Sequence, residues 1–146
     1  MTVRNTLADV GLKSINVFHR AILKVSGGRW LSKPLGMQTV ELHVTGRKSG
    51  LRRTVFLTAP IHDETRTVLI ASKGGDDRQP EWYLNLTANP DVELTIGKQT
   101  LPMRARTATP DEKAALWPDV VKAYKGYASY QKRTERDIPV VICTPR

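Results

Sequence analysis

Apolar residues recur at every second position in several short runs of this chain, and this periodicity most constrains the fold. It is typical of strands with one buried face, bounded here by glycine, proline and polar residues. The pattern predicts five or six strands, within residues 39–45, 52–63, 65–72, 91–96, 100–108 and 138–145. Polar turns at HDETR and GKQ predict that neighbouring strands form hairpins.

Only short helices are predicted between these strands. Residues 80–89 predict one helix, and residues 109–136 predict a second, with Thr109 as N-cap and Glu112 three residues later. Pro118 is expected to kink or split the second helix. Hairpins with few helices favour a mainly β (α+β) fold, a small antiparallel barrel with helices packed outside it, over a doubly wound sheet.

The first 30 residues differ from the rest. Residues 7–25 predict an amphipathic helix, which would cover part of a core or lie on a membrane surface. We therefore expect an N-terminal segment, 1–30, and a barrel domain, 31–146. No apolar run has the length of a membrane span, and the start does not resemble a signal peptide.

The single cysteine, Cys143, lies in an apolar run and is interpreted as a small buried side chain. One cysteine and no export signal predict a cytoplasmic protein. The formal net charge of +9 would attract anions. Nucleic acid, an anionic membrane and a multiply charged small molecule all fit this charge.

The stretch TGRKSGLRRT concentrates positive charge on one predicted turn. Its glycines allow close backbone approach, so that amide groups could face an anion. Lys48 and Arg53 add full charges, and Ser49 adds a hydroxyl. These features suit a phosphate cradle, although the spacing of a P-loop is absent. A solvated basic turn is the alternative.

Two further stretches carry candidate site residues. One leaves a strand at Ser72, passes Lys73 and Gly74, and enters a helix that carries Trp82. It combines backbone amides, a cation and an aromatic surface, although Trp82 could equally pack in the core. In the other stretch, three tyrosines are spaced by three residues, which predicts one helix face. They are Tyr124, Tyr127 and Tyr130.

Other catalytic arrangements are missing from the sequence. The three histidines are scattered without metal-binding spacing, and no metal site is predicted. No nucleophile elbow and no pair of acid/base carboxylates stands out. If the protein is an enzyme, a cofactor should carry the difficult chemistry.

Taken together, TGRKSGLRRT, ASKGG…PEWYLNLTANPDVEL and AYKGYASYQKRTERDIPVVIC resemble the deazaflavin-dependent nitroreductase family, from about His43 to the C-terminus. The resemblance implies a split β-barrel, related to flavin-reductase barrels, that uses coenzyme F420. This cofactor carries a phosphodiester and a polyglutamate tail, which would explain the basic turn. The implied activity is hydride transfer from reduced F420 to a quinone, with nitro compounds as opportunistic acceptors.

The family pattern also implies site residues. The phosphate and tail would be held by the basic turn, the deazaflavin by the second stretch with Trp82 at the rim, and the acceptor by the tyrosines, Tyr130 first. The candidate cofactor-binding residues are Arg47, Lys48, Ser49, Arg52, Arg53, Ser72, Lys73, Gly74 and Trp82. The candidate catalytic residues are Tyr130, Tyr127, Tyr124 and Ser72. Arg52 departs from the pattern, because many relatives carry proline there.

Three questions stay open from the sequence. The acceptor could be menaquinone, in which case residues 1–30 could bring the pocket to the inner face of the cell membrane. The alternatives are an FMN-binding split-barrel oxidoreductase and a non-enzymatic module for anionic lipid or nucleic acid, though no RNA-binding motif is present. The chain could be a monomer or a homodimer.

Overall fold

A computed structural model of the protein describes residues 37–146. The predicted segment 1–30 lies outside these residues. In chain order, the described elements are β1 (Gln38–Thr45), β2 (Arg52–Ala59), β3 (Ile61–His62), β4 (Thr67–Ile70), the 3-10 turn η2 (Lys73–Gly75), α2 (Glu81–Ala88), β5 (Asp91–Ile96), β6 (Gln99–Thr107), α3 (Pro110–Ala123), α4 (Gly126–Arg133) and β7 (Val140–Pro145).

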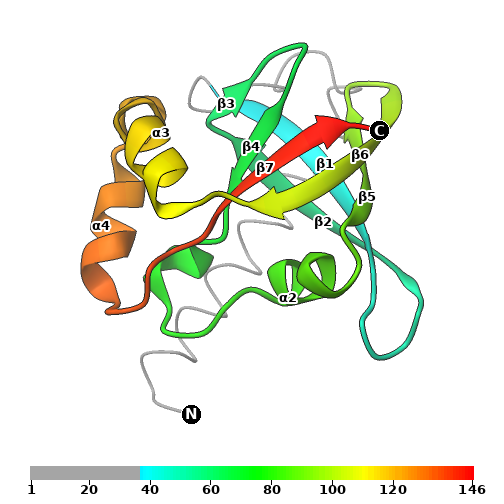
Figure 1. Cartoon of the computed structure of the whole chain (residues 1–146), viewed down its shortest axis with the longest axis horizontal. Coiled ribbons are helices and arrows are strands. Elements are labelled where there is room, and N and C mark those ends of the chain that lie inside the picture. Colours follow the sequence, from blue (N-terminus) through cyan, green and yellow to red (C-terminus); the bar gives the residue numbers. More distant parts are fainter. Residues whose placement is uncertain (1–36) are drawn as a thin grey trace, which may run out of the picture.

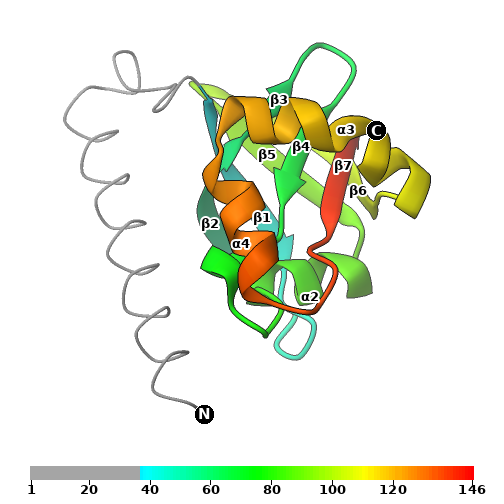
Figure 2. The same cartoon turned by 90° about the vertical axis from the view of Figure 1, so that its left-hand side faces the viewer.

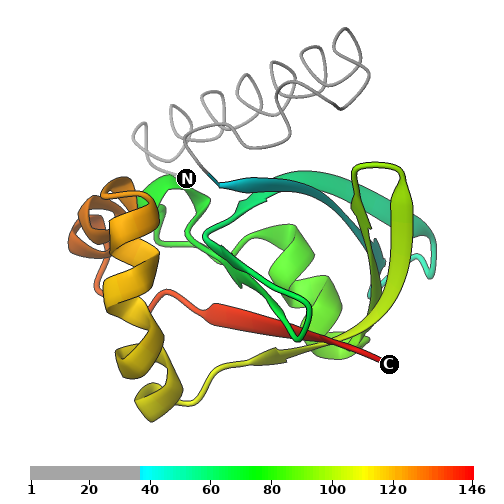
Figure 3. The ribbon, with the colours of Figure 1, turned by 90° about the horizontal axis from the view of Figure 1, so that it is seen from above.

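The described strands form one antiparallel sheet that curls into a half-barrel. Its order is β2-β1-β5-β6-β7-β4-β3, and the curvature is plain when the molecule is seen from above (Figure 3). Hairpins join β1 to β2, β3 to β4 and β5 to β6. The predicted antiparallel barrel is therefore confirmed.

Both faces of β4 and β7 are buried, which explains their nearly continuous apolar sequences. Alternate residues, such as Leu69 and Val141, point into the barrel core. Their neighbours Val68 and Ile142 point to a second core beneath α3 and α4. Cys143 is fully buried in the first core, and burial raises its thiol pKa to about 12, as expected for a packing residue.

The helices cover the barrel in two ways. Helices α3 and α4 lie outside the sheet, as predicted (Figure 2). Helix α2 lies across one end of the barrel (Figure 1) and inserts Trp82 and Leu86 into the inner core. This end also carries the β1–β2 loop, so α2 and the loop face each other.

Two boundaries differ from the sequence prediction. The expected strand 52–63 is divided at Pro60 into β2 and β3, because proline cannot donate a ladder hydrogen bond. The expected split of the helix at Pro118 is wrong. Helix α3 continues through this exposed residue and ends at its C-cap, Tyr124. The N-terminal capping box of Thr109 with Glu112 is formed as predicted.

Within residues 37–146, no helix has the length and apolar character needed to cross a membrane.

Candidate functional site

A pocket of about 490 Å³ lies between the β1–β2 loop and α2. Its volume is within the range of small-molecule and cofactor sites. Its lining combines apolar and aromatic side chains with cationic and polar groups: Val44, Gly46, Arg47, Lys48, Ser49, Arg53, Thr54, Val55, Glu81, Trp82 and Asn85. Four predicted residues of the basic turn, Arg47, Lys48, Ser49 and Arg53, and the predicted aromatic residue Trp82 therefore meet in one place.

The β1–β2 loop, residues 46–51, is closed by its own hydrogen bonds. The Gly46 amide donates to the Leu51 carbonyl at 2.8 Å, and the Gly50 amide donates to the Gly46 carbonyl at 2.9 Å. Gly50 has a φ of 70°, which favours glycine. A Cβ at Gly46 would lie 2.6 Å from the Ser49 hydroxyl oxygen. Both glycines are thus required by the tight turn.

This hydrogen bonding limits the predicted amide cradle. The amides of Gly46, Arg47, Gly50 and Leu51 all donate within the protein. The Ser49 hydroxyl accepts the Leu51 amide at 3.1 Å. Anion binding by the loop therefore depends mainly on its cationic side chains rather than on a ring of amides.

Arg47 connects the loop to α2. Its amide and its Nη1 donate to Oδ1 of the buried Asn85, at 3.1 and 2.9 Å. The same Nη1 lies 2.8 Å from Glu81 Oε2. The hydrogen bond from Arg47 lowers the pKa of the Glu81 carboxyl, against a smaller opposing effect of burial. Arg47 lines the pocket, but its charge is already paired.

Lys48 and Arg53 supply the charge that a ligand could use. Neither side chain makes a hydrogen bond or ion pair within residues 37–146. Arg53 is opposite Val44 in the β1–β2 register, and Val44 points into the barrel core, so Arg53 lies on the inner side of the sheet. The positive charges of Lys48 and Lys73 also contribute to the lowered pKa of Glu81. Positively charged side chains therefore lie in and around the pocket.

Arg52 lies on the opposite side of β2 and outside this pocket. Its guanidinium pairs with Glu93 of β5. It lines a separate hollow of about 220 Å³ together with His43 and Arg146. Alternation along the strand separates Arg52 from Arg53, so the structure does not bring Arg52 together with the other predicted residues.

The Ser72, Lys73 and Gly74 segment follows β4 as a tight turn. Lys73 has a φ of 46°, a conformation that costs a non-glycine residue free energy. The turn is braced by hydrogen bonds from the Gly75 amide to the Ser72 carbonyl at 2.9 Å and from the Asp76 amide to the Lys73 carbonyl at 3.1 Å. The positive charge of Lys73 helps to lower the pKa of Glu81, which lines the pocket. The turn itself does not line that pocket.

The three tyrosines form a cluster, but not on one helix. Tyr124 caps the end of α3, whereas Tyr127 and Tyr130 lie in α4. Ring centroids are 5.2 to 6.2 Å apart with steep interplanar angles. The Tyr124 and Tyr130 hydroxyls are 3.2 Å apart. At Gly126, a Cβ would lie 2.3 Å from the Tyr124 ring, so glycine is needed for this packing.

The environment raises the pKa of two of these phenols, Tyr127 and Tyr130. Burial raises the pKa of Tyr127, and burial together with the Tyr124 hydrogen bond raises that of Tyr130 to about 12. The Tyr130 side chain is only partly buried. It can therefore donate a hydrogen bond to a ligand oxygen while keeping its proton.

The 72–75 turn lies next to the tyrosine helix. Arg133 Nη1 donates to the Gly74 carbonyl at 3.2 Å, and a Cβ at Gly75 would lie 2.8 Å from the Tyr130 carbonyl oxygen. Figure 1 shows this turn between α4 and α2. The turn thus contacts α4, which carries Tyr127 and Tyr130, whereas the Tyr127 hydroxyl lies 3.5 Å from the Thr58 hydroxyl, at the end of the β1–β2 hairpin away from the basic loop.

Sequence reasoning missed two structural residues of the site. Asn85 was not singled out, although a polar residue on the buried side of a short helix is a detectable signal. Glu81, which opens α2, was missed as the partner of Arg47. No group of three side chains able to hold a metal ion occurs in the part of the chain described.

The fold and this site define a split-barrel protein with a pocket for an anionic, partly aromatic ligand. Comparison with known proteins shows to which family the chain belongs. Residues 17–145 match the family model described as F420H(2)-dependent quinone reductase. The chain therefore belongs to this family and is an oxidoreductase, and its cofactor is coenzyme F420.

Individual relatives agree with this assignment. A putative F420H(2)-dependent quinone reductase of Mycobacterium tuberculosis is 41% identical over 119 residues, covering 82% of this chain and 98% of the relative. An F420H(2)-dependent quinone reductase of the same organism is 39% identical over 141 residues, covering 94% and 93%.

Solved structures support the same family and fold. A structure titled F420-H2 dependent reductase has a TM-score of 0.65 at 40% identity and covers 72% of this chain and 92% of that one. A structure titled a domain-swapped dimer has a TM-score of 0.66 at 40% identity, covering 72% and 78%. A Clostridium acetobutylicum protein of the pyridoxinephosphate oxidase family, 13% identical with a TM-score of 0.52, shows the split-barrel fold alone.

The residues present fit this cofactor. Its anionic tail needs available cations, and Lys48 and Arg53, whose side chains have no partner among the described residues, line the 490 Å³ pocket. Its flat ring system needs an apolar wall, and Trp82 contributes one.

Proposed function

We propose that this protein transfers a hydride from reduced coenzyme F420 to a menaquinone-like quinone, and opportunistically to nitro compounds. The observation that carries the proposal is the pocket between the β1–β2 loop and α2, with two cations that have no side-chain partner within residues 37–146, beside an aromatic wall. When bound, the reduced deazaflavin supplies the hydride. The protein supplies placement, a partly dry site and hydrogen bonds.

Lys48 and Arg53 would hold the phosphodiester and glutamates of the tail. Arg47 would contribute indirectly, because its bonds to Asn85 and Glu81 fix the loop that carries Lys48. We assign Arg52 no direct role, since it pairs with Glu93 on the other side of the sheet. Ser72, Lys73 and Gly74 would border the deazaflavin from the turn after β4.

The tyrosine cluster would receive the electron acceptor. Tyr130 is the first candidate to touch it, because it is partly exposed while Tyr127 is buried. A phenol with a pKa near 12 retains its proton at neutral pH, so Tyr130 Oη can donate a hydrogen bond to an acceptor oxygen that gains negative charge. Tyr124 would hold the Tyr130 hydroxyl in place through their 3.2 Å contact.

This role is tested with the variant Tyr130→Phe. The control is Tyr83→Phe, which removes a phenol hydroxyl outside the cluster that contacts Thr107. We expect the Tyr130→Phe variant to lose roughly ten- to a hundredfold in kcat for a quinone, as for loss of one stabilising donor, while F420 affinity stays unchanged. Equal kcat for Tyr130→Phe and the parent would remove Tyr130 from the site.

The cofactor proposal is tested by two ligands and two variants. Binding of F420 is compared with binding of a deazaflavin that lacks the phosphodiester and glutamates. We expect Lys48→Ala to weaken F420 binding by about tenfold and to leave binding of the tail-less deazaflavin unchanged. The control is Lys98→Ala, at the exposed turn between β5 and β6. Equal losses for both ligands would show that Lys48 does not contact the tail.

We also propose that the protein works in the cytoplasm, against the inner face of the cell membrane, where a menaquinone would be found. Support comes from the net charge of +9 and from Leu51, a large apolar residue 60% exposed on the basic loop beside the pocket. Co-sedimentation with phosphatidylglycerol vesicles that falls with salt is expected. Equal sedimentation with neutral phosphatidylcholine vesicles would contradict this.

The assembly is proposed to be a homodimer, because a solved relative of 40% identity is titled a domain-swapped dimer. Light scattering of the full chain is expected to give twice the chain mass. A monomer at micromolar concentration would refute it.

A further inference from the structure

Arg136 is a half-buried cation that lies outside the cofactor pocket and has no carboxylate among its hydrogen-bond partners within residues 37–146. Its Nε donates to the Asp76 carbonyl at 2.9 Å, and its Nη1 donates to the Gln79 side-chain oxygen at 2.8 Å. Its Nη2 donates to the carbonyls of Ala71 and Ser72, at 3.2 and 3.0 Å. The guanidinium therefore binds one segment, residues 71–79, at four acceptors.

This segment includes the turn that borders the proposed deazaflavin site. Its backbone is strained at Lys73, where φ is 46°. A strained turn keeps its shape only when its surroundings determine it, and the Ser72 carbonyl accepts from both the Gly75 amide and Arg136. A planar guanidinium with several fixed donors suits this task better than a single ammonium group.

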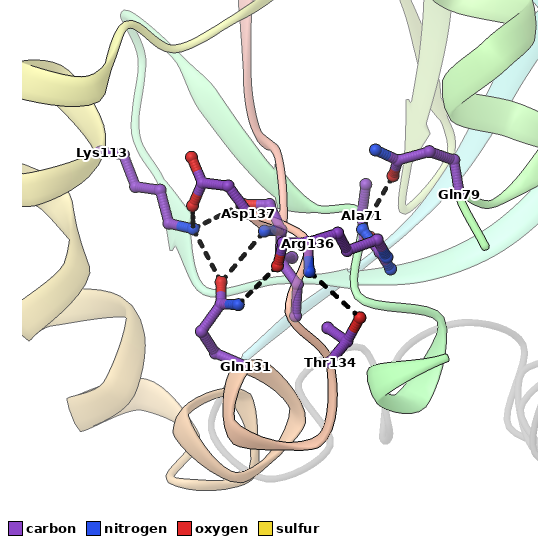
Figure 4. Close-up of polar contacts among 8 residues, drawn as sticks. Ala71, Gln79, Lys113, Gln131, Thr134, Arg136 and Asp137 are labelled. Atoms are coloured by element: carbon purple, nitrogen blue, oxygen red, sulfur yellow. Dashed lines mark hydrogen bonds and ion pairs between the residues drawn. The ribbon is translucent and has the colours of Figure 1, made fainter. Parts of the chain in front are cut away.

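Arg136 also joins this turn to the tyrosine helix. Its own carbonyl oxygen accepts from Gln131 Nε2 at 2.7 Å, and Gln131 follows Tyr130 in α4. Figure 4 shows the Arg136 side chain directed to Ala71 and Gln79, while the Gln131 side chain contacts the backbone of Arg136 itself. One residue thus connects the two parts of the site.

The next residue, Asp137, belongs to a second network, which shares Gln131 with Arg136. Lys113 pairs with Asp137 and donates to the Gln131 side chain at 2.9 Å and to the Ile138 carbonyl at 2.8 Å (Figure 4). This network fastens α3 to α4 and to the segment before β7, and none of its bonds reaches residues 71–79. Lys113 therefore offers a matched control, a partly buried cation whose own hydrogen bonds and ion pair do not reach residues 71–79.

We infer that Arg136 is a positioning residue, which holds the 71–75 turn in the shape that accepts the deazaflavin. It acts through the turn and does not touch the reacting atoms. The inference rests on the proposed function, since it assigns the turn to the coenzyme. Asp76 is not the alternative anchor for Arg136, because its buried carboxylate is bound by Arg78 at 2.8 to 3.0 Å.

The test compares Arg136→Lys, Arg136→Gln and Lys113→Met in the full chain. We measure F420 binding, thermal unfolding, and trypsin cleavage at Lys73 and Arg78 by mass spectrometry without cofactor. For Arg136→Lys we expect F420 binding to weaken about tenfold and cleavage at Lys73 and Arg78 to accelerate, because one ammonium cannot satisfy four acceptors. Lys113→Met is expected to lower the unfolding temperature while F420 binding stays within about twofold of the parent.

The outcomes separate the inference from the proposed function. A parent protein that binds no F420 would refute the cofactor site on which the inference rests. A parent that binds F420, with Arg136→Lys binding equally well and resisting trypsin equally, would refute the inference alone. Equal weakening by Arg136→Lys and Lys113→Met would show a general loss of packing and would also overturn it. If Arg136→Gln does not fold, Arg136→Lys decides.

Discussion

Asn85 anchors the β1–β2 loop, and we expect its replacement to lower both the free energy of unfolding and the affinity for F420. Oδ1 of this buried side chain accepts one hydrogen bond from the Arg47 amide and one from its guanidinium. In Asn85→Leu, which keeps the branching at Cγ but replaces the amide oxygen and nitrogen by methyl groups, both donors lose their acceptor. A neutral bond contributes about 0.5–1.5 kcal/mol and a charged one about 1.5–3 kcal/mol.

The sum of these two contributions overstates the loss in the free energy of unfolding. The Arg47 side chain is 26% exposed and retains Glu81, so water and the carboxylate recover part of it. We expect a net destabilisation of about 2 kcal/mol. For a domain of this size, that corresponds to a fall of about 4–8 °C in unfolding temperature. Because the released loop carries Lys48, F420 affinity should fall by about tenfold.

The assay is differential scanning calorimetry together with an F420 titration. Asn85→Asp retains the Oδ1 acceptor of both hydrogen bonds and is expected to unfold near the parent temperature, although its added charge should still weaken binding of the anionic tail. Asn89→Leu, at the exposed end of the same helix, is the control for helix propensity. Unchanged unfolding and unchanged F420 affinity in Asn85→Leu would refute the claim that this contact orders the loop.

Three further predictions concern packing, pH and salt. Gly126→Ala should lower the free energy of unfolding by at least about 1 kcal/mol in urea titrations, because the new methyl group overlaps the Tyr124 ring, and an unchanged value would contradict the packing. Hydrogen bonds from Arg106 and the Thr109 amide lower the Glu112 pKa to about 2. The stability from Glu112 is therefore present above its ordinary pKa of 4.5 and lost as pH falls toward 2, so Glu112→Gln should reduce the pH dependence of unfolding in that window; an identical pH profile would count against it. F420 affinity should also fall with rising salt, and less steeply in Lys48→Ala; parallel salt slopes would argue against a direct charge contact.

Local patterns were sufficient to predict most of the fold. Period-two alternation identified the strands, and Thr109 with Glu112 marked the start of α3 because both halves of a capping box are local. Pro118 misled the prediction, since a proline on the exposed side of a helix loses a single hydrogen bond without ending it. The helix instead ends at its C-cap, Tyr124, whose ring packs closely over Gly126.

The sequence predicted a basic turn but not its internal bonding. The glycine and cations of that turn line the pocket between the β1–β2 loop and α2. The sequence did not show that Arg47 is paired with Asn85, which is 38 residues away, or that Arg52 points away from the pocket. Arg136 is 64 residues from Ser72, and contacts between a side chain and such a distant carbonyl leave no local signature.

The central claim is that this protein binds F420 in the pocket between the β1–β2 loop and α2 and uses it to reduce a quinone. The most direct test mixes the purified full chain with reduced F420 and menadione under anaerobic conditions and follows the absorbance of oxidised F420. We expect saturable binding of F420 and menadione-dependent oxidation that requires the protein and is weakened in Lys48→Ala with Arg53→Ala. Absence of F420 binding, or oxidation at the same rate in that double variant, would contradict the account.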